Sequence, residues 1–310
     1  MENKTNNPIE PDGVLIIDKH AGVTSHDIIG AVRRLYGTRR VGHTGTLDPM
    51  ATGVLVVLVG RAAKAAEYIQ SDGKRYIAGM KLGVETDTED TTGTLTGEYS
   101  GVMPAPDKVF EACGKFVGDI MQVPPMYSAI KVGGRKLYEL ARAGETIDIA
   151  ARPVTIYSLD ASEEDINESI YRLDVVCSGG TYIRSLCRDI GAALGCGGAM
   201  CSLRRMRSGR FDISAAHTVA QIEEMSADER LTQLMPTETL FAELDKVQLS
   251  DFYARLAHSG AEIYQKKIKT EYPVGVRVRL YDADGFFAIG EAMDYEEGSA
   301  LKPIKTFRLQ

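Results

Sequence analysis

One aspartate stands in a segment whose composition restricts the backbone. Asp48 lies between Gly45 and Gly53 and directly precedes Pro49. Glycine reaches dihedrals closed to other residues, whereas a proline pins its own φ and drives the preceding residue toward an extended conformation. A single carboxylate on such a stiff loop could act as a nucleophile or as a general base. The same composition also suits a helix cap or an Asx turn.

Regular elements on both sides of the loop would hold it in place. Residues 54–59, Val-Leu-Val-Val-Leu-Val, predict a buried strand directly after it. Before it, residues 13–19 predict a strand and residues 25–36 a helix capped by Ser25. The periodicity predicts further elements in chain order: a helix over 62–70, a strand over 75–82, a helix over 106–118, a strand over 171–178 and a helix over 181–190.

The remaining segments predict loops and a second, smaller domain. Residues 86–96 are rich in threonine and acids and predict a solvated loop, whereas the adjacent prolines in residues 123–131 predict an ordered, non-helical one. Near the C-terminus, residues 273–281 and 286–292 predict a hairpin with an Asp-Ala-Asp-Gly turn. We therefore expect a catalytic domain over residues 1–245 and a small β domain over residues 246–310.

Composition indicates a soluble globular protein of about two domains. The chain has 310 residues, of which 44% are hydrophobic and 25% charged. The start of the chain shows no secretory pattern, and the apolar run at 54–59 is too short to span a bilayer, so we predict a cytoplasmic protein without membrane contact. The five cysteines form no Cys-x-x-Cys pair, which predicts reduced thiols and no zinc site.

Charge is distributed unevenly along the chain. The net charge of −7 argues against binding nucleic acid through bulk charge. Residues 184–210 nevertheless carry six arginines and one acid, whereas every charged residue in 85–98 is acidic. A basic cleft on an acidic body can bind one RNA shape selectively. The alternative is that the arginines form solvated helix faces.

Residues 42–53, Gly-His-Thr-Gly-Thr-Leu-Asp-Pro-Met-Ala-Thr-Gly, resemble the signature of the tRNA pseudouridine synthase B family. That family isomerises the uridine at position 55 in the T loop of tRNA. The resemblance runs from about Gly13 to Phe211 and implies an α/β (α+β) fold, the pseudouridine synthase fold, with a mixed, largely antiparallel central sheet. The C-terminal β domain resembles the PUA module, an RNA-binding pseudobarrel.

The resemblance also implies roles for particular residues. Asp48 matches the catalytic aspartate, which reaches its target uridine only after the base has been flipped out of the loop. Arg184 matches the partner that would orient this carboxylate and keep it charged. Tyr76 matches the residue that stacks on the extruded uracil and helps remove its C5 proton. Further pocket positions are matched by Lys19, His43 and Leu203. Without the resemblance, these side chains suit a structural ion pair or core packing.

The implied reaction breaks the N1–C1′ bond of uridine and joins C5 to C1′. It therefore needs no redox cofactor, metal or nucleotide, and the chain has neither a Walker loop nor a dinucleotide fingerprint. We expect the tRNA T arm as partner, no obligate protein partner, and a monomer. The chain departs from the family at His20, where a proline is usual, and at Gly179, where a basic residue is common.

Three alternatives stay open at this point. The same chemistry occurs in the catalytic subunit of guide-RNA-directed pseudouridylation complexes. A second alternative is an RNA-binding or tRNA-folding module. The third is a serine acyl enzyme, because Ser128 and Lys131 match Ser-x-x-Lys, although no Ser-Asp-Asn or Lys-Thr-Gly companion exists. In the small domain, a lysine cluster predicts an auxiliary RNA grip: Lys266, Lys267 and Lys269.

Overall fold

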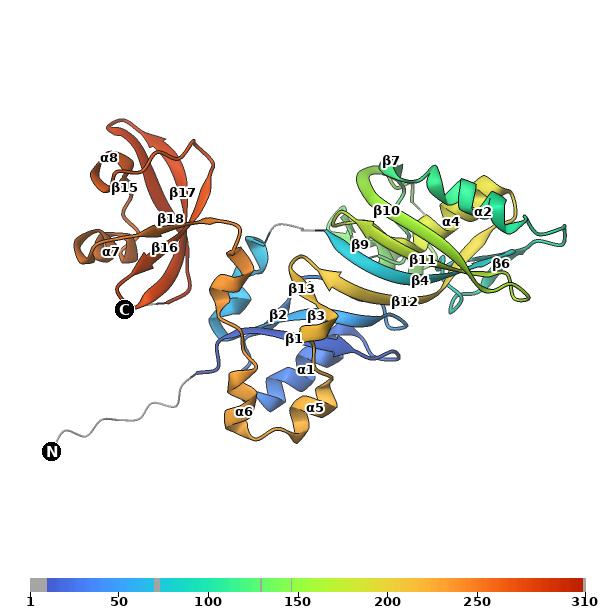
Figure 1. Cartoon of the computed structure of the whole chain (residues 1–310), viewed down its shortest axis with the longest axis horizontal. Helices are drawn as coiled ribbons and strands as arrows, with labels where there is room; N and C mark the ends of the chain where they lie inside the picture. Colours follow the sequence, from blue (N-terminus) through green and yellow to red (C-terminus); the bar gives the residue numbers. More distant parts are fainter. Residues whose placement is uncertain (1–9, 70–72, 129, 146, 309–310) are drawn as a thin grey trace.

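The larger part of the chain is built on one mixed sheet. The computed structural model describes residues 10–69, 73–128, 130–145 and 147–308. Nine strands form the sheet in the order β1-β3-β12-β4-β11-β10-β7, with β2 beside β3 and β13 beside β12 (Figure 1). Their bounds are β1 Gly13–Lys19, β2 Val41–His43, β3 Thr52–Val59, β4 Lys74–Leu82, β7 Gly118–Gln122, β10 Arg152–Asp165, β11 Ile170–Cys177, β12 Gly198–Ser208 and β13 Phe211–Asp212.

Strand direction agrees with the predicted sheet. The pair of β12 and β3 is parallel, and the other pairs of this sheet are antiparallel. The mixed, largely antiparallel sheet is thus confirmed. Two short hairpins lie outside it: β5 Val84–Thr86 with β6 Leu95–Glu98, and β8 Lys131–Val132 with β9 Arg135–Lys136.

Two groups of helices pack at opposite ends of the sheet (Figure 1). Helices α1 (Ser25–Leu35) and α5 (Val219–Glu224) lie beside β1 and β2, and α2 (Pro106–Gly114) and α4 (Ile183–Leu194) lie beside β10 and β12. The other helices of this part are α3 Leu137–Arg142, α6 Ala227–Thr232, and the 3-10 helices η1 Gly60–Glu67, η2 Ile213–Ala215 and η3 Thr237–Phe241. Within the described ranges, no helix has the length and apolarity to cross a membrane.

Several local predictions need correction. Thr24 rather than Ser25 caps α1, since its hydroxyl accepts the Asp27 N–H while the Asp27 carboxylate accepts the Thr24 N–H. The segment predicted as a helix over 62–70 is the 3-10 helix η1, and residue 70 lies outside the described residues. Helix α2 ends at Gly114, because residues from Gly118 onward pair with β10 as strand β7.

A smaller five-stranded sheet follows, in the order β14-β16-β17-β18-β15. Its elements are β14 Asp245–Gln248, α7 Asp251–His258, β15 Ile263–Tyr264, α8 Gln265–Ile268, β16 Arg277–Asp282, β17 Gly285–Tyr295 and β18 Gly298–Thr306. The predicted hairpin is present as β16 and β17. This sheet curls into a half-barrel, so the presence of a small C-terminal β domain is confirmed.

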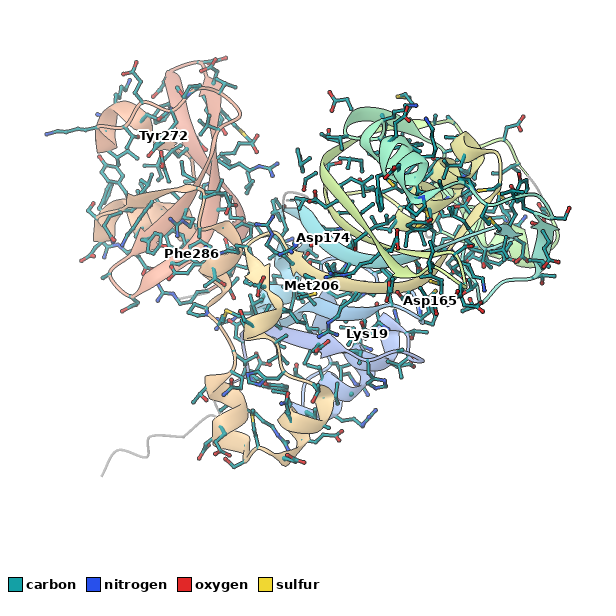
Figure 2. All side chains as sticks on the ribbon, turned by 45° about the vertical axis from the view of Figure 1, so that its right-hand side comes forward. Lys19, Asp165, Asp174, Met206, Tyr272 and Phe286 are labelled. Atoms are coloured by element: carbon teal, nitrogen blue, oxygen red, sulfur yellow. The ribbon has the colours of Figure 1, made fainter. Side chains whose placement is uncertain are left out.

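The two sheets share apolar packing. Phe241 of η3 lies 5.7 Å, centroid to centroid, from Phe307 and 6.2 Å from Phe286. Phe286 projects from the face of the small sheet turned toward the large one (Figure 2). Phe307 belongs to the same buried cluster as Val54 and Val56 of β3. The small sheet therefore also covers an apolar face of the large one.

Candidate active site

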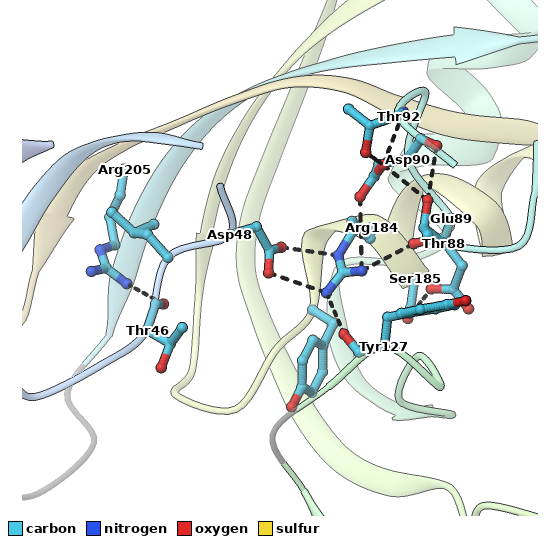
Figure 3. A network of polar contacts seen from close by, with 12 residues as sticks. Thr46, Asp48, Thr88, Glu89, Asp90, Thr92, Tyr127, Arg184, Ser185 and Arg205 are labelled. Carbon is cyan, nitrogen blue, oxygen red and sulfur yellow. Dashed lines mark hydrogen bonds and ion pairs between the residues drawn. The ribbon is translucent and has the colours of Figure 1, made fainter. Parts of the chain in front are cut away.

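Asp48 and Arg184 form an ion pair at the centre of a polar network beside the large sheet (Figure 3). Arg184 Nε lies 3.0 Å from Asp48 Oδ2, and Arg184 Nη2 donates to Asp48 Oδ1 at 3.3 Å. The Asp48 side chain is 34% exposed, whereas that of Arg184 is 5% exposed. The carboxylate is thus held from behind by a buried cation and stays reachable from solvent.

The other groups around Arg184 fix its guanidinium. Nη1 donates to the Thr88 carbonyl at 3.0 Å, and Nη2 donates to the Tyr127 carbonyl at 2.9 Å. Nη1 also lies 3.8 Å from Oδ2 of Asp90, whose side chain is 7% exposed (Figure 3). Arg184 therefore joins three segments that are far apart in the sequence.

The acidic segment 86–96 holds this network and is not merely the solvated loop predicted. The Asp90 carboxylate accepts hydrogen bonds from the Thr88 hydroxyl at 2.9 Å and from the Thr92 N–H at 3.0 Å. Glu89 has a φ of 62° and accepts from Ser185 at 2.6 Å. These two acids are withdrawn from solvent, contrary to the expectation, because each carboxylate has a cation or a hydroxyl as its partner.

Two side chains hold the backbone on either side of Asp48. Ser25 Oγ accepts the Leu47 N–H at 2.9 Å and donates to the Leu47 carbonyl at 3.1 Å. The fully buried Lys19 donates to the Pro49 carbonyl at 3.3 Å and to the Val23 carbonyl at 2.8 Å. The residue before the aspartate and the residue after it are therefore both fixed by buried hydrogen bonds.

Arg205 of β12 braces the same loop over a longer span. Its guanidinium donates to the carbonyls of Gly45 at 3.1 Å, Thr46 at 3.3 Å and Val54 at 2.7 Å. Gly53 pairs in register with Arg205 and has a φ of 98°. A Cβ added at Gly53 would clash with the Arg205 carbonyl. Position 53 therefore requires glycine for two reasons: its positive φ, and the close approach of the Arg205 backbone.

Burial and neighbouring charges shift the ionisation of the site. Burial raises the pKa of Asp48, an effect to which Asp90 adds and which Arg184 and Lys19 oppose. Burial lowers the pKa of Lys19 to about 8, although Asp48 acts in the opposite direction. Burial also raises the pKa of Tyr76, so its phenol is protonated at neutral pH.

The remaining predicted pocket residues lie on strands around the loop. Tyr76 of β4 is buried and pairs in register with Arg205, and Leu203 of β12 pairs with Ala78. His43 ends β2, and its Nδ1 is buried without a hydrogen-bond partner in the described chain. Burial lowers the pKa of His43, so the imidazole favours the neutral form. Arg184 thus meets Asp48 directly and Lys19 fixes the adjoining backbone, whereas these three side chains surround the loop from neighbouring strands.

Sequence reasoning missed two contributors, Asp90 and Arg205. For Asp90, the density of threonine and aspartate in Thr86–Thr96 was a usable signal, because such residues bond local backbone groups in tight turns. Among the described residues, no group of three or more His, Cys, Asp or Glu could hold a metal ion. Ser128 is buried, and the side chain of Lys131 lies outside the described residues.

The chain that carries this site matches two protein-family models. The N-terminal domain model of TruB family pseudouridylate synthases matches residues 33–183, and a tRNA pseudouridylate synthase B C-terminal domain model matches residues 184–242. The chain is 38% identical over 287 residues to the tRNA pseudouridine synthase B of Francisella tularensis subsp. novicida, covering 92% of each. It is 39% identical to that of Alkaliphilus oremlandii, covering 96% of this chain and 98% of the relative.

Solved structures show the same architecture. A crystal structure of a Cbf5-Nop10-Gar1 complex includes a chain with a TM-score of 0.70 and 26% identity, covering 96% of this chain and 86% of that one. A chain of an archaeal box H/ACA sRNP Nop10-Cbf5 complex gives a TM-score of 0.69 at 25% identity, covering 97% and 87%. The chain therefore belongs to the TruB family of pseudouridylate synthases, and its activity is that of a tRNA pseudouridine synthase, an isomerase.

Proposed function

We propose that this enzyme converts the uridine at position 55 of the tRNA T loop to pseudouridine, with Asp48 as nucleophile after the base has been flipped out. The single observation that carries the proposal is the Asp48–Arg184 pair, a solvent-reachable carboxylate backed by a buried guanidinium. A carboxylate fixed in this way is prepared to attack carbon without losing its charge.

Two modes of attack suit this geometry, at C1′ of the ribose or at C6 of the uracil. Both need Asp48 ionised, and both end with the N1–C1′ bond broken and a C5–C1′ bond formed. Arg184 favours the ionised form of Asp48, and Lys19 does so through its charge while also fixing the Pro49 carbonyl. These cations oppose the effect of burial on the pKa of this carboxylate without cancelling it.

The surrounding strands supply the pocket for the flipped base. Tyr76, protonated at neutral pH, offers a ring face for stacking on uracil and a phenol near the departing C5 proton. Leu203 of β12 adds apolar surface, and neutral His43 borders the space from which the base has been withdrawn. An aromatic and apolar pocket suits a base removed from its stack.

The guide-RNA-directed alternative receives less support. The relatives described as tRNA pseudouridine synthase B are 38–39% identical to this chain, compared with 25–26% for the matched chains of the Cbf5-containing complexes. We therefore favour a stand-alone enzyme, monomeric and cytoplasmic, that binds the T arm of tRNA. The part up to residue 245 would carry the chemistry, and the part from 246 would assist RNA binding.

An RNA-folding activity is compatible with this function, because flipping a loop nucleotide opens tertiary contacts of tRNA.

A tritium-release assay tests the proposal. A T-arm hairpin carrying tritium at C5 of its uridines is incubated with the enzyme, and label is released only where C5 is joined to C1′. We expect release of one equivalent per hairpin, and none from a matched hairpin with cytidine at the target position. Release that persists from the cytidine hairpin, or absence of release from the uridine hairpin, overturns the proposed site of modification.

A further inference from the structure

A small cavity lies beside the loop that carries Asp48, which contributes Thr44 to its lining. Its volume is about 90 Å³, and its polar lining consists of Thr44, Lys74, Ser208 and Arg210. Apolar residues of β3, η1 and η3 line much of the rest. Thr44 directly follows His43, and Lys74 lies two positions before Tyr76 on the same face of β4. The cavity therefore adjoins the pocket proposed for the flipped base.

Lys74 is the charged group of this cavity for which the described part of the chain offers no hydrogen-bond or ion-pair partner. Among the described residues, its ammonium makes no hydrogen bond and no ion pair, and no carboxylate lines the cavity. A Cβ added at Gly45 would lie 3.6 Å from Lys74 Nζ and 3.7 Å from Arg205 Nη1, so the two cations flank the same point of the loop. Burial and the Arg205 charge both lower the pKa of Lys74.

An unpaired cation in such a place is unfavourable until an anion arrives. Arg205 uses its donors on the carbonyls of Gly45, Thr46 and Val54, and Arg210 donates to the Thr239 carbonyl at 3.4 Å. Neither arginine neutralises Lys74, and both add positive potential to the cavity. A partly buried cationic recess of this size suits one phosphate group and is too small for a nucleoside.

We propose that this cavity binds one backbone phosphate of the substrate RNA next to the flipped uridine, with Lys74 as its charged ligand. The inference rests on the proposed function, because the RNA reaches this recess only when its target base occupies the neighbouring pocket. Thr44 and Arg210 line the same cavity and would add a hydroxyl and a guanidinium beside the bound phosphate. The contact fixes the register of the RNA and carries no base specificity.

Neutral linkages in the RNA identify the contacted phosphate. A series of T-arm hairpins carries a single methylphosphonate at successive positions around the target uridine, and dissociation constants are measured for the parent and for Lys74→Gln. The parent should lose affinity on the order of 10-fold at one linkage. Lys74→Gln should bind the unmodified hairpin more weakly by the same factor, and a methylphosphonate at that linkage should weaken its binding no further. The slope of its log affinity against log salt concentration should flatten by about one.

Two further variants keep the result interpretable. Lys74→Arg should retain the parental salt slope, and Lys81→Gln, on the same strand and paired with Glu168, should bind like the parent. Tritium release by the parent reports the proposed function separately from this contact. If the parent is active, two results overturn the phosphate site. In the first, Lys74→Gln binds the hairpin as tightly as Lys81→Gln does. In the second, every methylphosphonate weakens the binding of Lys74→Gln as much as it weakens the binding of the parent. An inactive parent overturns the proposed function instead.

Discussion

The guanidinium of Arg184 contacts both oxygens of Asp48 and, on another edge, lies 3.8 Å from the carboxylate of Asp90. One buried cation thus serves two carboxylates, of which only Asp48 is substantially exposed. The arrangement assigns different roles to the two acids. Asp48 is reachable from solvent, whereas Asp90 is buried against the cation that pairs with Asp48.

Arg184→Lys should separate chemistry from binding. Lysine keeps the positive charge but loses the planar fork that meets Asp48, Thr88 and Tyr127 together, so the carboxylate loses its fixed orientation. We expect the single-turnover rate to fall on the order of 100-fold while RNA affinity changes little. Arg172→Lys, on the exposed face of β11, is the control. Parental rates in Arg184→Lys would make Arg184 a structural residue only.

Turnover should be lost at a higher pH than the ordinary pKa of an aspartate would predict. Asp48 must be ionised to attack, and burial and Asp90 raise its pKa, so the rate should fall as the pH drops through a value above the usual 3.8. Asp90→Asn removes one of the charges that raise this pKa and should move the acid limb to lower pH, together with a lower plateau. The single-turnover rate at saturating RNA reports both effects, with Asp107→Asn as an exposed control. An acid limb that moves to higher pH in Asp90→Asn would contradict this electrostatic account.

Gly53→Ala should damage both stability and turnover. The new Cβ meets the Arg205 carbonyl, and φ at this position is positive. The free energy of unfolding should fall by about 1–3 kcal/mol, and the shifted loop should slow the reaction. At Gly30, inside α1, an added Cβ would meet only the tip of the Arg34 side chain, at an ordinary contact distance of 3.9 Å, so Gly30→Ala should be neutral or stabilising by up to about 1 kcal/mol. Denaturant titrations of the two variants give the comparison. Equal stabilities would show that β3 and β12 tolerate a wider separation.

The sequence predicted local features well and long-range contacts poorly. The uninterrupted apolar run of β3 and the glycines around Asp48 indicated a rigid loop on a buried strand, because both signals are carried by neighbouring residues. The contacts of Arg205 with Gly45 and Thr46 join β12 to a loop far away in sequence, and no local pattern specifies them. Arg184 was matched through resemblance, since an arginine near a helix start is otherwise an ordinary surface residue.

The acidic segment illustrates a second limit. Composition predicts solvation for Thr86–Thr96, and most proteins do expose such sequences. Asp90 is buried because Arg184 and two threonines meet it, which depends on where α4 lies in the fold. The cap of α1 differs from the prediction for a related reason: Ser25 is hydrogen-bonded to Leu47, next to Asp48, and Thr24 takes the capping position.

The lysine cluster in and directly after α8 should contribute to RNA binding and not to the reaction rate. Lys266, Lys267 and Lys269 are exposed, and Lys266 donates to the Glu297 carbonyl at 3.1 Å. Because the two sheets share apolar packing, point variants in the full chain are a cleaner test than truncation. Replacing all three with glutamine should weaken T-arm tRNA binding and flatten the salt slope by about one for each lysine that pairs with a phosphate, at unchanged saturating rate. A control pair on and beside α2, Lys108→Gln with Lys115→Gln, should leave both unchanged. Parental affinity in the triple variant would remove the RNA grip from this account.

Single-turnover kinetics of Asp48→Asn test the central claim most directly. Asparagine keeps the size of the side chain and much of its hydrogen bonding but removes the negative charge that attacks the uridine. With a tritiated T-arm hairpin at saturating enzyme, we expect a rate at least about 10⁴-fold below the parent, at an RNA dissociation constant within a few-fold of it. Turnover at a rate near the parental one would contradict the assignment of Asp48 as the nucleophile.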